Sequence, residues 1–336
     1  MNLPLEARVG DFTSRPNGQA RGVRRGGNPV SEGEHRYREV PVHRATIIGV
    51  TFVLLAVAGC ADPGSTTTAS SAPSASTAAD LAAEVPTALR QKGTLTVATD
   101  ATYAPNEFFA PDNKTIQGFD VDLGNAIAQT LGLKTHWVNA GFTGIIPGLA
   151  AGRYDLSMSS FTDTKAREQT VDFVTYYSTG TSIVVKAGNP AHIRAKLDLC
   201  GKKAAAEKGT IQVDDIAAVT KACTAAGRPA VAGQTYPDQN AVGLAVSTGK
   251  ADAYLADTPV GEYQVHQSGG RFALAGSSYD TAPYGIAIPK SGGTLKVAIR
   301  DALKRLIADG EYRRILDRWS LSTGAITEPV INGAQS

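Results

Sequence analysis

A short apolar run, residues 45–59, divides this chain of 336 residues and limits how much of it can fold into one body. Its fifteen residues are too few to cross a bilayer as a helix, which needs about 20. Basic residues, the last of them Arg44, precede the run, and small residues end it directly before Cys60. This order is typical of a secretory signal. We therefore expect residues 1–59 to be an N-terminal extension and signal peptide that the mature protein lacks.

The end of this run, Val57-Ala58-Gly59-Cys60, resembles the lipobox of bacterial lipoproteins. The resemblance implies cleavage before Cys60 and attachment of lipid to that residue; an ordinary signal peptide with a chance cysteine is the alternative. Residues 61–83 consist mostly of Ser, Thr, Ala, Pro and Gly, a composition that cannot bury enough apolar surface to offset the entropy of folding. We expect residues 60–83 to be a lipid-anchored, flexible linker.

The charge of the mature chain argues against nucleic acid as a partner. Residues 1–59 hold 8 of the 33 basic and 5 of the 31 acidic residues, which leaves 25 basic and 26 acidic residues in the mature chain. No stretch of this chain concentrates Lys and Arg as nucleic-acid-binding proteins do. The slight basic excess of the whole sequence therefore belongs to the segment that is removed.

Cys200 and Cys223 are the two cysteines that remain once Cys60 is assigned to lipid. Disulfides persist in exported proteins, so we predict a bond between these two residues, with a pair of buried thiols as the alternative. Closing a loop of this length adds about 3 kcal/mol of stability in the chain-entropy model.

From Glu84 onward, strand-like and helix-like patterns alternate along the chain. Runs of apolar residues predict strands at 95–99, 155–159, 182–186 and 251–255. Apolar residues at helical spacing predict helices at 121–131, 295–307 and 312–319. Such alternation indicates α/β layers around a mainly parallel sheet.

One pattern occurs twice in this region. Residues 148–155 and 243–252 each read as a helix end, a glycine turn and a strand that begins at an aspartate. The two strands run into polar residues, Ser159 and Ser160 in the first and Asp257 in the second. Because ligands of open α/β sheets bind beyond the carboxyl ends of strands, the repeat indicates two lobes that face one another.

The stretch from Ser159 to Arg167 offers groups suited to a small zwitterion such as an amino acid. A carboxylate prefers the planar, bidentate donor of an arginine, here Arg167. Hydroxyl groups lie at the strand end, and Asp163 or Thr164 can cap the following helix. Taken singly, Arg167 could also be an ordinary exposed arginine and the serines ordinary strand-end residues.

Five motifs in this part of the chain occur together in a fixed order. They are Thr99-Asp100-Ala101-Thr102-Tyr103-Ala104-Pro105, Gly118-Phe119-Asp120-Val121-Asp122-Leu123, Ile146-Pro147-Gly148-Leu149, Thr164-Lys165-Ala166-Arg167 and Val171-Asp172-Phe173. In this order they resemble the bacterial family 3 extracellular solute-binding proteins, the amino-acid receptors of ATP-driven importers. The resemblance covers about residues 90–322.

The resemblance implies an α/β, two-lobed periplasmic-binding-protein type II fold, with two mixed sheets, flanking helices and a two-strand hinge. Lobe 1 would comprise residues 84–180 and 282–325, lobe 2 residues 181–281, and a C-terminal tail residues 326–336. The hinge would lie near residues 178–183 and 276–287, where it lets the lobes close on a ligand.

The resemblance also implies roles for individual residues around a free amino acid. Arg167 would hold the ligand's carboxylate, and Asp257 would hold its ammonium group. The remaining positions are hydroxyls that contact polar groups at Ser159, Ser160 and Thr162, a Gly-Thr turn that donates from its backbone at Thr210, aromatic walls at Tyr103 and Phe142, and a side-chain acceptor at Asp100. Two positions depart from the family pattern: Ile211 stands where a second hydroxyl is common, and Asn106 stands where an aromatic residue or proline is common.

We expect a monomer that works with the permease and ATPase subunits of an ABC importer and with the membrane through its anchor. No catalytic or metal-ligand spacing is evident, so we expect neither an enzyme nor a cofactor. The alternatives are a sensor subunit, a non-binding surface adhesin, and an exported dehydratase of the same fold, for which Glu107, Asp163 and Glu207 are nearby candidate acids. Asp100 favours a side chain with N–H donors, either an amide or a basic group, and the ligand's identity stays open.

Overall fold

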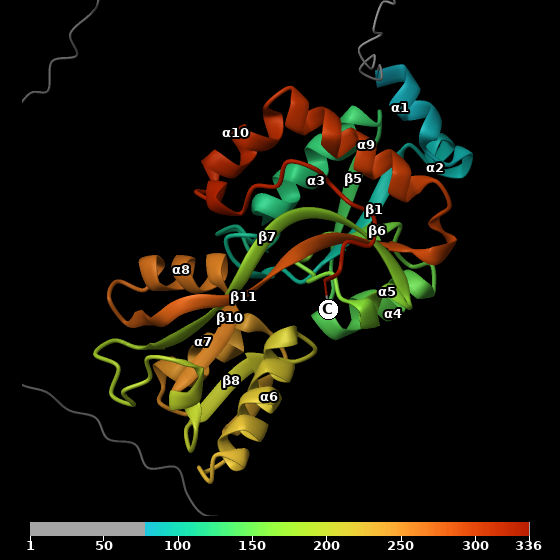
Figure 1. Cartoon of the computed structure of the whole chain (residues 1–336). Coiled ribbons are helices and arrows are strands. Elements are labelled where there is room, and N and C mark those ends of the chain that lie inside the picture. Colours follow the sequence, from blue (N-terminus) through green and yellow to red (C-terminus); the bar gives the residue numbers. More distant parts are fainter. Residues whose placement is uncertain (1–77, 336) are drawn as a thin grey trace, which may run out of the picture. The chain divides into compact units, whose positions relative to one another are not determined.

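The computed structural model describes residues 78–335, arranged as in Figure 1. The predicted signal peptide, the lipid-bearing Cys60 and the linker up to residue 77 lie outside the described residues. Within the described part of the chain, no helix combines the length and the apolar character that crossing a bilayer requires.

The folded body begins earlier than the linker prediction of 60–83 allowed. Helix α1 spans Ala78–Glu84, and Leu81, on that helix, is buried in the core together with Val85. These two residues are four apart, so they lie on one helical side, and α1 packs on helix α9 (Leu295–Ala308). The linker prediction is therefore wrong for its last six residues, because one bulky apolar side chain at the end of a polar stretch was enough to anchor a helical turn.

The described residues form two lobes that are joined by two long strands, β7 (Val171–Lys186) and β11 (Phe272–Pro289) (Figure 1). Besides α1, α9 and the adjoining parts of β7 and β11, lobe 1 contains α2 (Thr87–Lys92), β1 (Thr94–Thr99), β2 (Thr102–Tyr103), β3 (Glu107–Phe109), β4 (Ile116–Gln117), α3 (Phe119–Thr130), β5 (Lys134–Asn139), α4 (Phe142–Ala150), β6 (Leu156–Ser157), α5 (Lys165–Glu168) and α10 (Glu311–Arg318). Lobe 2 contains β8 (Lys203–Glu207), α6 (Ile211–Ala225), β9 (Ala232–Tyr236), α7 (Gln239–Ser247), β10 (Ala253–Asp257) and α8 (Thr258–Gln267).

Eight strands form one mixed sheet in the order β5-β1-β6-β11-β7-β10-β8-β9. Strand β1 pairs in parallel with β5 and β6, and β8 pairs in parallel with β9 and β10. The antiparallel pair of β7 and β11 joins the two halves, and its register shifts between Ala275 and Ala282. The predicted α/β architecture of mixed sheets with flanking helices is thus present, with its two halves connected through these strands. The predicted crossing points near 178–183 and 276–287 fall within β7 and β11.

The two lobes are filled differently. Large rings pack in lobe 1, where the centroids of Phe119 and Tyr177 lie 5.4 Å apart and those of Tyr177 and Tyr284 lie 5.6 Å apart. Lobe 2 has small buried residues on β8 and the predicted disulfide between Cys200 and Cys223, which the structure confirms. The Cα atoms of the two cysteines are 5.6 Å apart, within the usual range for a disulfide.

The repeated helix–glycine–strand pattern serves the same local purpose in both lobes. The Asp155 carboxylate accepts a hydrogen bond from the backbone N–H of Thr96, at the start of β1. The Asp252 carboxylate accepts one from the backbone N–H of Lys203, at the start of β8. Each aspartate therefore ties the beginning of one strand to its neighbour, and the two strand pairs carry polar residues at their other ends.

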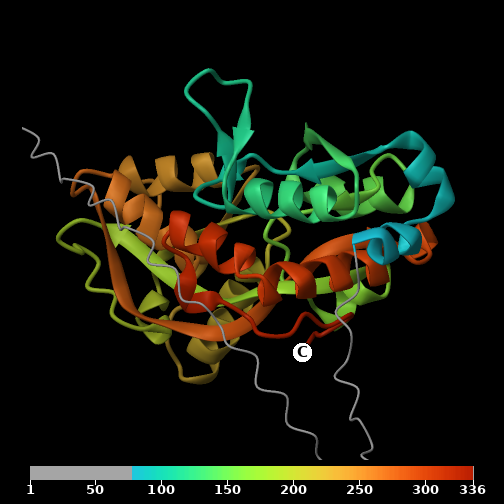
Figure 2. The same ribbon diagram turned by 90° about the horizontal axis from the view of Figure 1, so that it is seen from above.

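The predicted C-terminal tail, residues 326–336, packs on lobe 1 as far as it is described. Ile331 forms an antiparallel bridge with Val174, and the backbone N–H of Gly333 donates to the Asp163 carboxylate at 2.8 Å. On the other side of lobe 1 the β3–β4 hairpin projects from the body (Figure 2). Its Phe108 ring contacts Trp319 near the end of α10 and Tyr263 on α8, so it touches both lobes.

Candidate functional site

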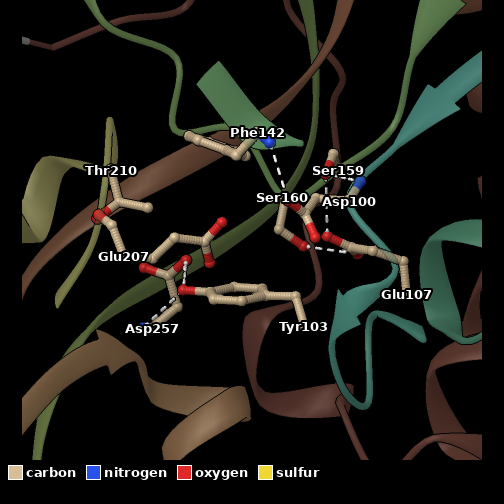
Figure 3. Close-up of a pocket in the computed structure, with 9 residues that line it drawn as sticks. All are labelled: Asp100, Tyr103, Glu107, Phe142, Ser159, Ser160, Glu207, Thr210 and Asp257. Atoms are coloured by element: carbon tan, nitrogen blue, oxygen red, sulfur yellow. Dashed lines mark hydrogen bonds between the residues drawn. The ribbon is translucent and has the colours of Figure 1, made fainter. Parts of the chain in front are cut away.

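A narrow cavity lies between the lobes at the ends of β1, β6, β8 and β10 (Figure 3). From lobe 1 it is lined by Asp100, Tyr103, Glu107, Phe142, Ser159 and Ser160, and from lobe 2 by Glu207, Thr210 and Asp257. Its volume is about 10 Å³, roughly the room that one water molecule needs. Four of the nine lining residues are acidic and none is basic.

The lobe 1 side of the cavity is held by a hydrogen-bonded network. The hydroxyls of Ser159 and Ser160 donate to the two carboxyl oxygens of Glu107, at 3.3 and 3.2 Å. Ser160 has a φ of 49°, in the left-handed region, and its backbone N–H donates to the Asp120 carboxylate at 2.9 Å. A backbone of this kind costs energy, and the bond to buried Asp120 holds it in place. Burial and the neighbouring Asp120 raise the pKa of Glu107 well above its ordinary value.

Asp100 follows β1 and has a donor for each carboxyl oxygen. The Thr102 hydroxyl donates to Oδ1 at 2.8 Å, and the first N–H of α4, from Phe142, donates to Oδ2 at 2.8 Å. Burial raises the pKa of Asp100, and these two hydrogen bonds oppose the rise. The side chain thus lies in a fixed position at the cavity wall, next to the Phe142 ring.

Asp257 ends β10 and is also fully hydrogen-bonded, from both lobes. The Tyr103 hydroxyl of lobe 1 donates to its Oδ2 at 2.9 Å, and the Gln212 amide of α6 donates to its Oδ1 at 2.8 Å. Burial raises the pKa of Asp257 to about 6, and the donors lower it. A carboxylate placed in this way is a strong acceptor for a cation that enters the cavity.

Glu207, at the end of β8, differs from the other three carboxyl groups. It is buried, and its Oε1 atom has no hydrogen-bond partner among the described residues. Burial raises the pKa of Glu207 to about 9, and the negative charges of Asp100, Asp238 and Asp257 add to this rise. Figure 3 shows its side chain pointing into the cavity beside Asp257.

Arg167 lies next to the cavity and connects the lobes. Its guanidinium donates to the backbone carbonyl of Thr162 at 2.7 Å and, across the cleft, to that of Gly209 at 3.0 Å. It also lies over the rings of Phe161 and Phe142, at 5.1 and 5.6 Å from their centroids. Burial lowers the pKa of Arg167 to about 10, with Asp257 opposing the change, so the group keeps its positive charge near neutral pH.

The turn after β8 approaches lobe 1 closely. Gly209 has a φ of 87°, and a Cβ at this position would lie 2.7 Å from the Thr143 methyl group on α4. Only glycine therefore fits here without moving the lobes apart. The next residue, Thr210, begins the α6 turn, and its hydroxyl donates to the Glu207 carbonyl at 2.8 Å.

The structure brings together seven of the ten predicted ligand residues: Asp100, Tyr103, Phe142, Ser159, Ser160, Thr210 and Asp257. Thr162, Arg167 and Ile211 do not line the cavity as it stands. Thr162 and Arg167 are joined by the hydrogen bond described above, Arg167 lies over the ring of Phe142, and Ile211 is the first residue of α6.

Sequence reasoning gave no ligand role to Glu107, Glu207 or Gln212. Glu107 and Glu207 entered as candidate acids of a rival enzyme, together with Asp163, which instead binds the backbone of the C-terminal segment. The signal for Glu207 was its position at the end of a strand, the same rule that identified Asp257. Gln212 carried no signal, because its hydrogen bond to Asp257 joins the start of α6 to the end of β10, 45 residues further along the chain.

Comparison with known proteins agrees with this geometry. Residues 95–322 match the model of the bacterial extracellular solute-binding proteins, family 3. The chain belongs to this family. The family consists of solute-binding proteins, and the relatives described below are amino-acid-binding proteins, which agrees with the expectation of a binding protein and not an enzyme. Within the described residues, no group of three or more His, Cys, Asp or Glu side chains could hold a metal ion.

Individual relatives extend the match over the whole folded body. The chain is 31% identical to the arginine-binding protein ArgT of Corynebacterium glutamicum over 254 residues, which cover 75% of this chain and 83% of the relative. A solved structure of an ancestral arginine-binding protein bound to arginine has a TM-score of 0.62 and 34% identity, and it covers 68% of this chain and 98% of its own. A solved structure of an ancestral arginine-binding protein bound to glutamine has a TM-score of 0.63 and 33% identity, and it covers 68% of this chain and 98% of its own. The predicted periplasmic-binding-protein fold is thereby confirmed.

Proposed function

We propose that this protein binds an amino acid with a positively charged side chain, of the arginine type, between its two lobes and delivers it to an ABC importer. The observation that carries the proposal is the set of four acidic side chains in the cavity. Asp100, Glu107, Glu207 and Asp257 line it, and Arg167 lies over the ring of Phe142 in its wall. Burial raises the pKa of each of these carboxyl groups, and a ligand that brings positive charge favours their ionised form.

The roles of the residues follow from the charges of such a ligand. Asp257 accepts from the α-ammonium group, and Arg167 donates to the α-carboxylate together with the backbone N–H of Thr210. Asp100 accepts from the side-chain cation between the rings of Tyr103 and Phe142. The names of the relatives described above, which bind arginine, support the same ligand class.

Closure of the lobes is the event that the importer would recognise. A cavity of about 10 Å³ does not admit an amino acid, so the lobes must separate for entry. We assign the movement to β7 and β11, with residues 84–180 and 282–325 moving as lobe 1 and residues 181–281 as lobe 2. Ligand bound to both lobes favours the closed form by its differential affinity for it.

We further propose that Cys60 carries lipid and holds the protein at the outer face of the membrane, close to the permease. Membrane fractionation of the wild type and of the Cys60→Ala variant, expressed in a bacterium with lipoprotein processing, tests this point. The wild type is expected in the membrane fraction and the variant in the soluble fraction. Equal membrane association of both would contradict the lipid anchor.

Isothermal titration calorimetry against the twenty standard amino acids and ornithine tests the ligand class. We expect arginine, lysine and ornithine to bind, and arginine at micromolar Kd or better, about −8 kcal/mol. Binding of a neutral or acidic amino acid more tightly than any cationic one would overturn the proposal.

A further inference from the structure

Among the described residues, Glu207 is the one carboxyl group of the cavity that has an oxygen without an N–H or hydroxyl donor. The carboxyl oxygens of Asp100, Glu107 and Asp257 each have an N–H or hydroxyl donor from their own lobe or from across the cleft, whereas Oε1 of Glu207 has none among the described residues. Glu207 is 3% exposed and faces the cavity (Figure 3). A buried acceptor without a donor is costly, so its presence at a binding site points to a donor on the ligand.

The charged groups that face Glu207 come from several elements, and the nearest are acidic. Asp100 follows β1 of lobe 1, Asp238 precedes α7, and Asp257 ends β10. The Tyr103 hydroxyl of β2 also lies within electrostatic reach. Among these, Asp100 belongs to the opposite lobe, so its distance from Glu207 depends on how far the lobes have closed.

The other charges of the site are matched without Glu207. By the proposed function, on which this inference rests, Arg167 meets the ligand's carboxylate and Asp257 meets its ammonium group, and any amino acid supplies both. Glu107 is bonded to two serines and stays neutral because burial and Asp120 favour its protonated form. Asp100 and Glu207 therefore remain for the side chain.

We propose that Asp100 and Glu207 form a pair of acceptors, one from each lobe, that makes complete closure depend on a positive charge in the ligand's side chain. When the lobes close without a cation, the two carboxyl groups hydrogen-bond to one another and share a proton, because burial and the charge of Asp100 raise the pKa of Glu207. A guanidinium or ammonium group between them displaces this proton and binds to two negative charges. A neutral amide leaves it in place, so Glu207 acts as a specificity-determining residue that discriminates against neutral ligands.

Arginine and citrulline are the pair of ligands that isolates this effect. They have nearly the same length and shape and the same α-ammonium and α-carboxylate groups, but citrulline carries a neutral ureido group in place of guanidinium. Because Asp257 and Arg167 treat them alike, the ratio of their dissociation constants reports the charge selectivity of the pair. Lysine, with a compact cation, is a second charged probe.

The experiment measures Kd for L-arginine and L-citrulline by calorimetry in the wild type, Glu207→Gln and Glu262→Gln. Glu262 is an exposed residue of α8 in the same lobe, so its variant makes the same chemical change outside the cavity. We expect the wild type to prefer arginine at least about 100-fold. Glu207→Gln is expected to reduce this preference at least about tenfold, chiefly through weaker arginine binding, and Glu262→Gln to keep the wild-type ratio.

This experiment distinguishes failure of the proposed function from failure of the role assigned to Glu207. If the wild type does not bind arginine, the proposed function itself fails. If it binds arginine but Glu207→Gln retains the wild-type ratio of the two ligands, only the role of Glu207 is refuted. Thermal unfolding of each variant shows first that it folds.

A measurement on the wild type alone covers the case in which Glu207→Gln does not fold. Calorimetry in buffers of different ionisation enthalpy gives the number of protons released on binding. We expect release with arginine near pH 7, because the cation displaces a proton held by the pair, and no release with citrulline. Equal proton release with both ligands would overturn the inference.

Discussion

The two sides of the cavity differ in where their buried carboxyl groups find hydrogen-bond donors. On the lobe 1 side, Asp100 and Glu107 are bonded to groups of their own lobe before any ligand arrives. On the lobe 2 side, Asp257 takes one of its donors from lobe 1, and Glu207 has an oxygen that no N–H or hydroxyl group of residues 78–335 reaches. The acidic groups of lobe 1 therefore have their hydrogen-bond donors within that lobe, whereas those of lobe 2 gain donors from lobe closure and from the ligand.

This difference assigns separate tasks to the lobes. Pre-bonded side chains hold their positions at little cost on binding, which suits a first docking surface. Groups that gain partners only in the closed form contribute binding energy to closure itself, since a ligand shifts an equilibrium by its differential affinity for the two states. We expect substitution of Arg167 in lobe 1 to change affinity for all amino acids, and substitution of Glu207 in lobe 2 to change closure and selectivity.

Arg167→Ala should have the largest effect, because this side chain belongs to lobe 1 but donates to Gly209 of lobe 2. Its loss should weaken binding of every amino acid by about 2–5 kcal/mol, as truncating a buried charged partner does. Lys165→Ala is the matched control, since Lys165 is exposed on the same short helix and pairs with Glu168. Calorimetry that gives wild-type affinity for Arg167→Ala would remove Arg167 from the site.

The disulfide allows the core of lobe 2 to be perturbed apart from its cavity. Replacing Cys200 and Cys223 by serine should lower the free energy of unfolding by about 3 kcal/mol, since the bond closes a loop with a sequence separation of 23. Both cysteines belong to the buried core of this lobe. Chemical denaturation measures the loss. If arginine affinity fell by a comparable amount, lobe 2 could not be treated as a rigid support.

Acidification should weaken binding through Asp257. Burial raises its pKa to about 6 in the ligand-free cavity. The ligand's ammonium group requires the ionised form, so protons compete with the ligand, and affinity is lost as pH falls through 6, approaching about tenfold per pH unit. Calorimetry from pH 8 to 4.5 should find this loss for citrulline as well as arginine. An affinity that stays constant over this range would separate Asp257 from the ammonium group.

Glu107→Gln should have the smallest effect and sharpen the contrast with Glu207. Burial and Asp120 keep Glu107 protonated near neutral pH, so glutamine replaces it without a change of charge. Its amide can still bond Ser159 or Ser160. We expect arginine affinity within about threefold of wild type, below 1 kcal/mol. A larger loss, measured by the same calorimetry, would show that Glu107 meets the ligand as an anion.

The same contrast between the lobes explains how far the sequence could predict this molecule. Asp100 and Tyr103 fall in one contiguous motif, and Ser159 and Ser160 in the polar stretch that ends at Arg167, so the sequence could propose all four for the site. Glu207 lies at a strand end without a motif around it, and its importance comes from Asp100 of the other lobe, which no local pattern shows. The early start of α1 was missed because Leu81 matters only through its packing on α9.

For Arg167, the sequence predicts the helix in which it lies but not the contacts of its side chain. Its position at the start of α5 follows from the Thr164 cap, whose hydroxyl accepts from the Arg167 backbone N–H. Its side chain bonds the carbonyls of Thr162 and Gly209, a geometry that arises only when the lobes are close. Closure is a property of two lobes in contact, and periodicity along one strand or helix carries no information about it.

A crystal structure of the protein grown with L-arginine tests the central claim most directly. The account predicts one arginine molecule enclosed by both lobes, with its carboxylate at Arg167, its ammonium group at Asp257 and its guanidinium between Asp100 and Glu207. An Arg167 side chain turned to solvent beside an empty cleft, in crystals that contain saturating arginine, would contradict it.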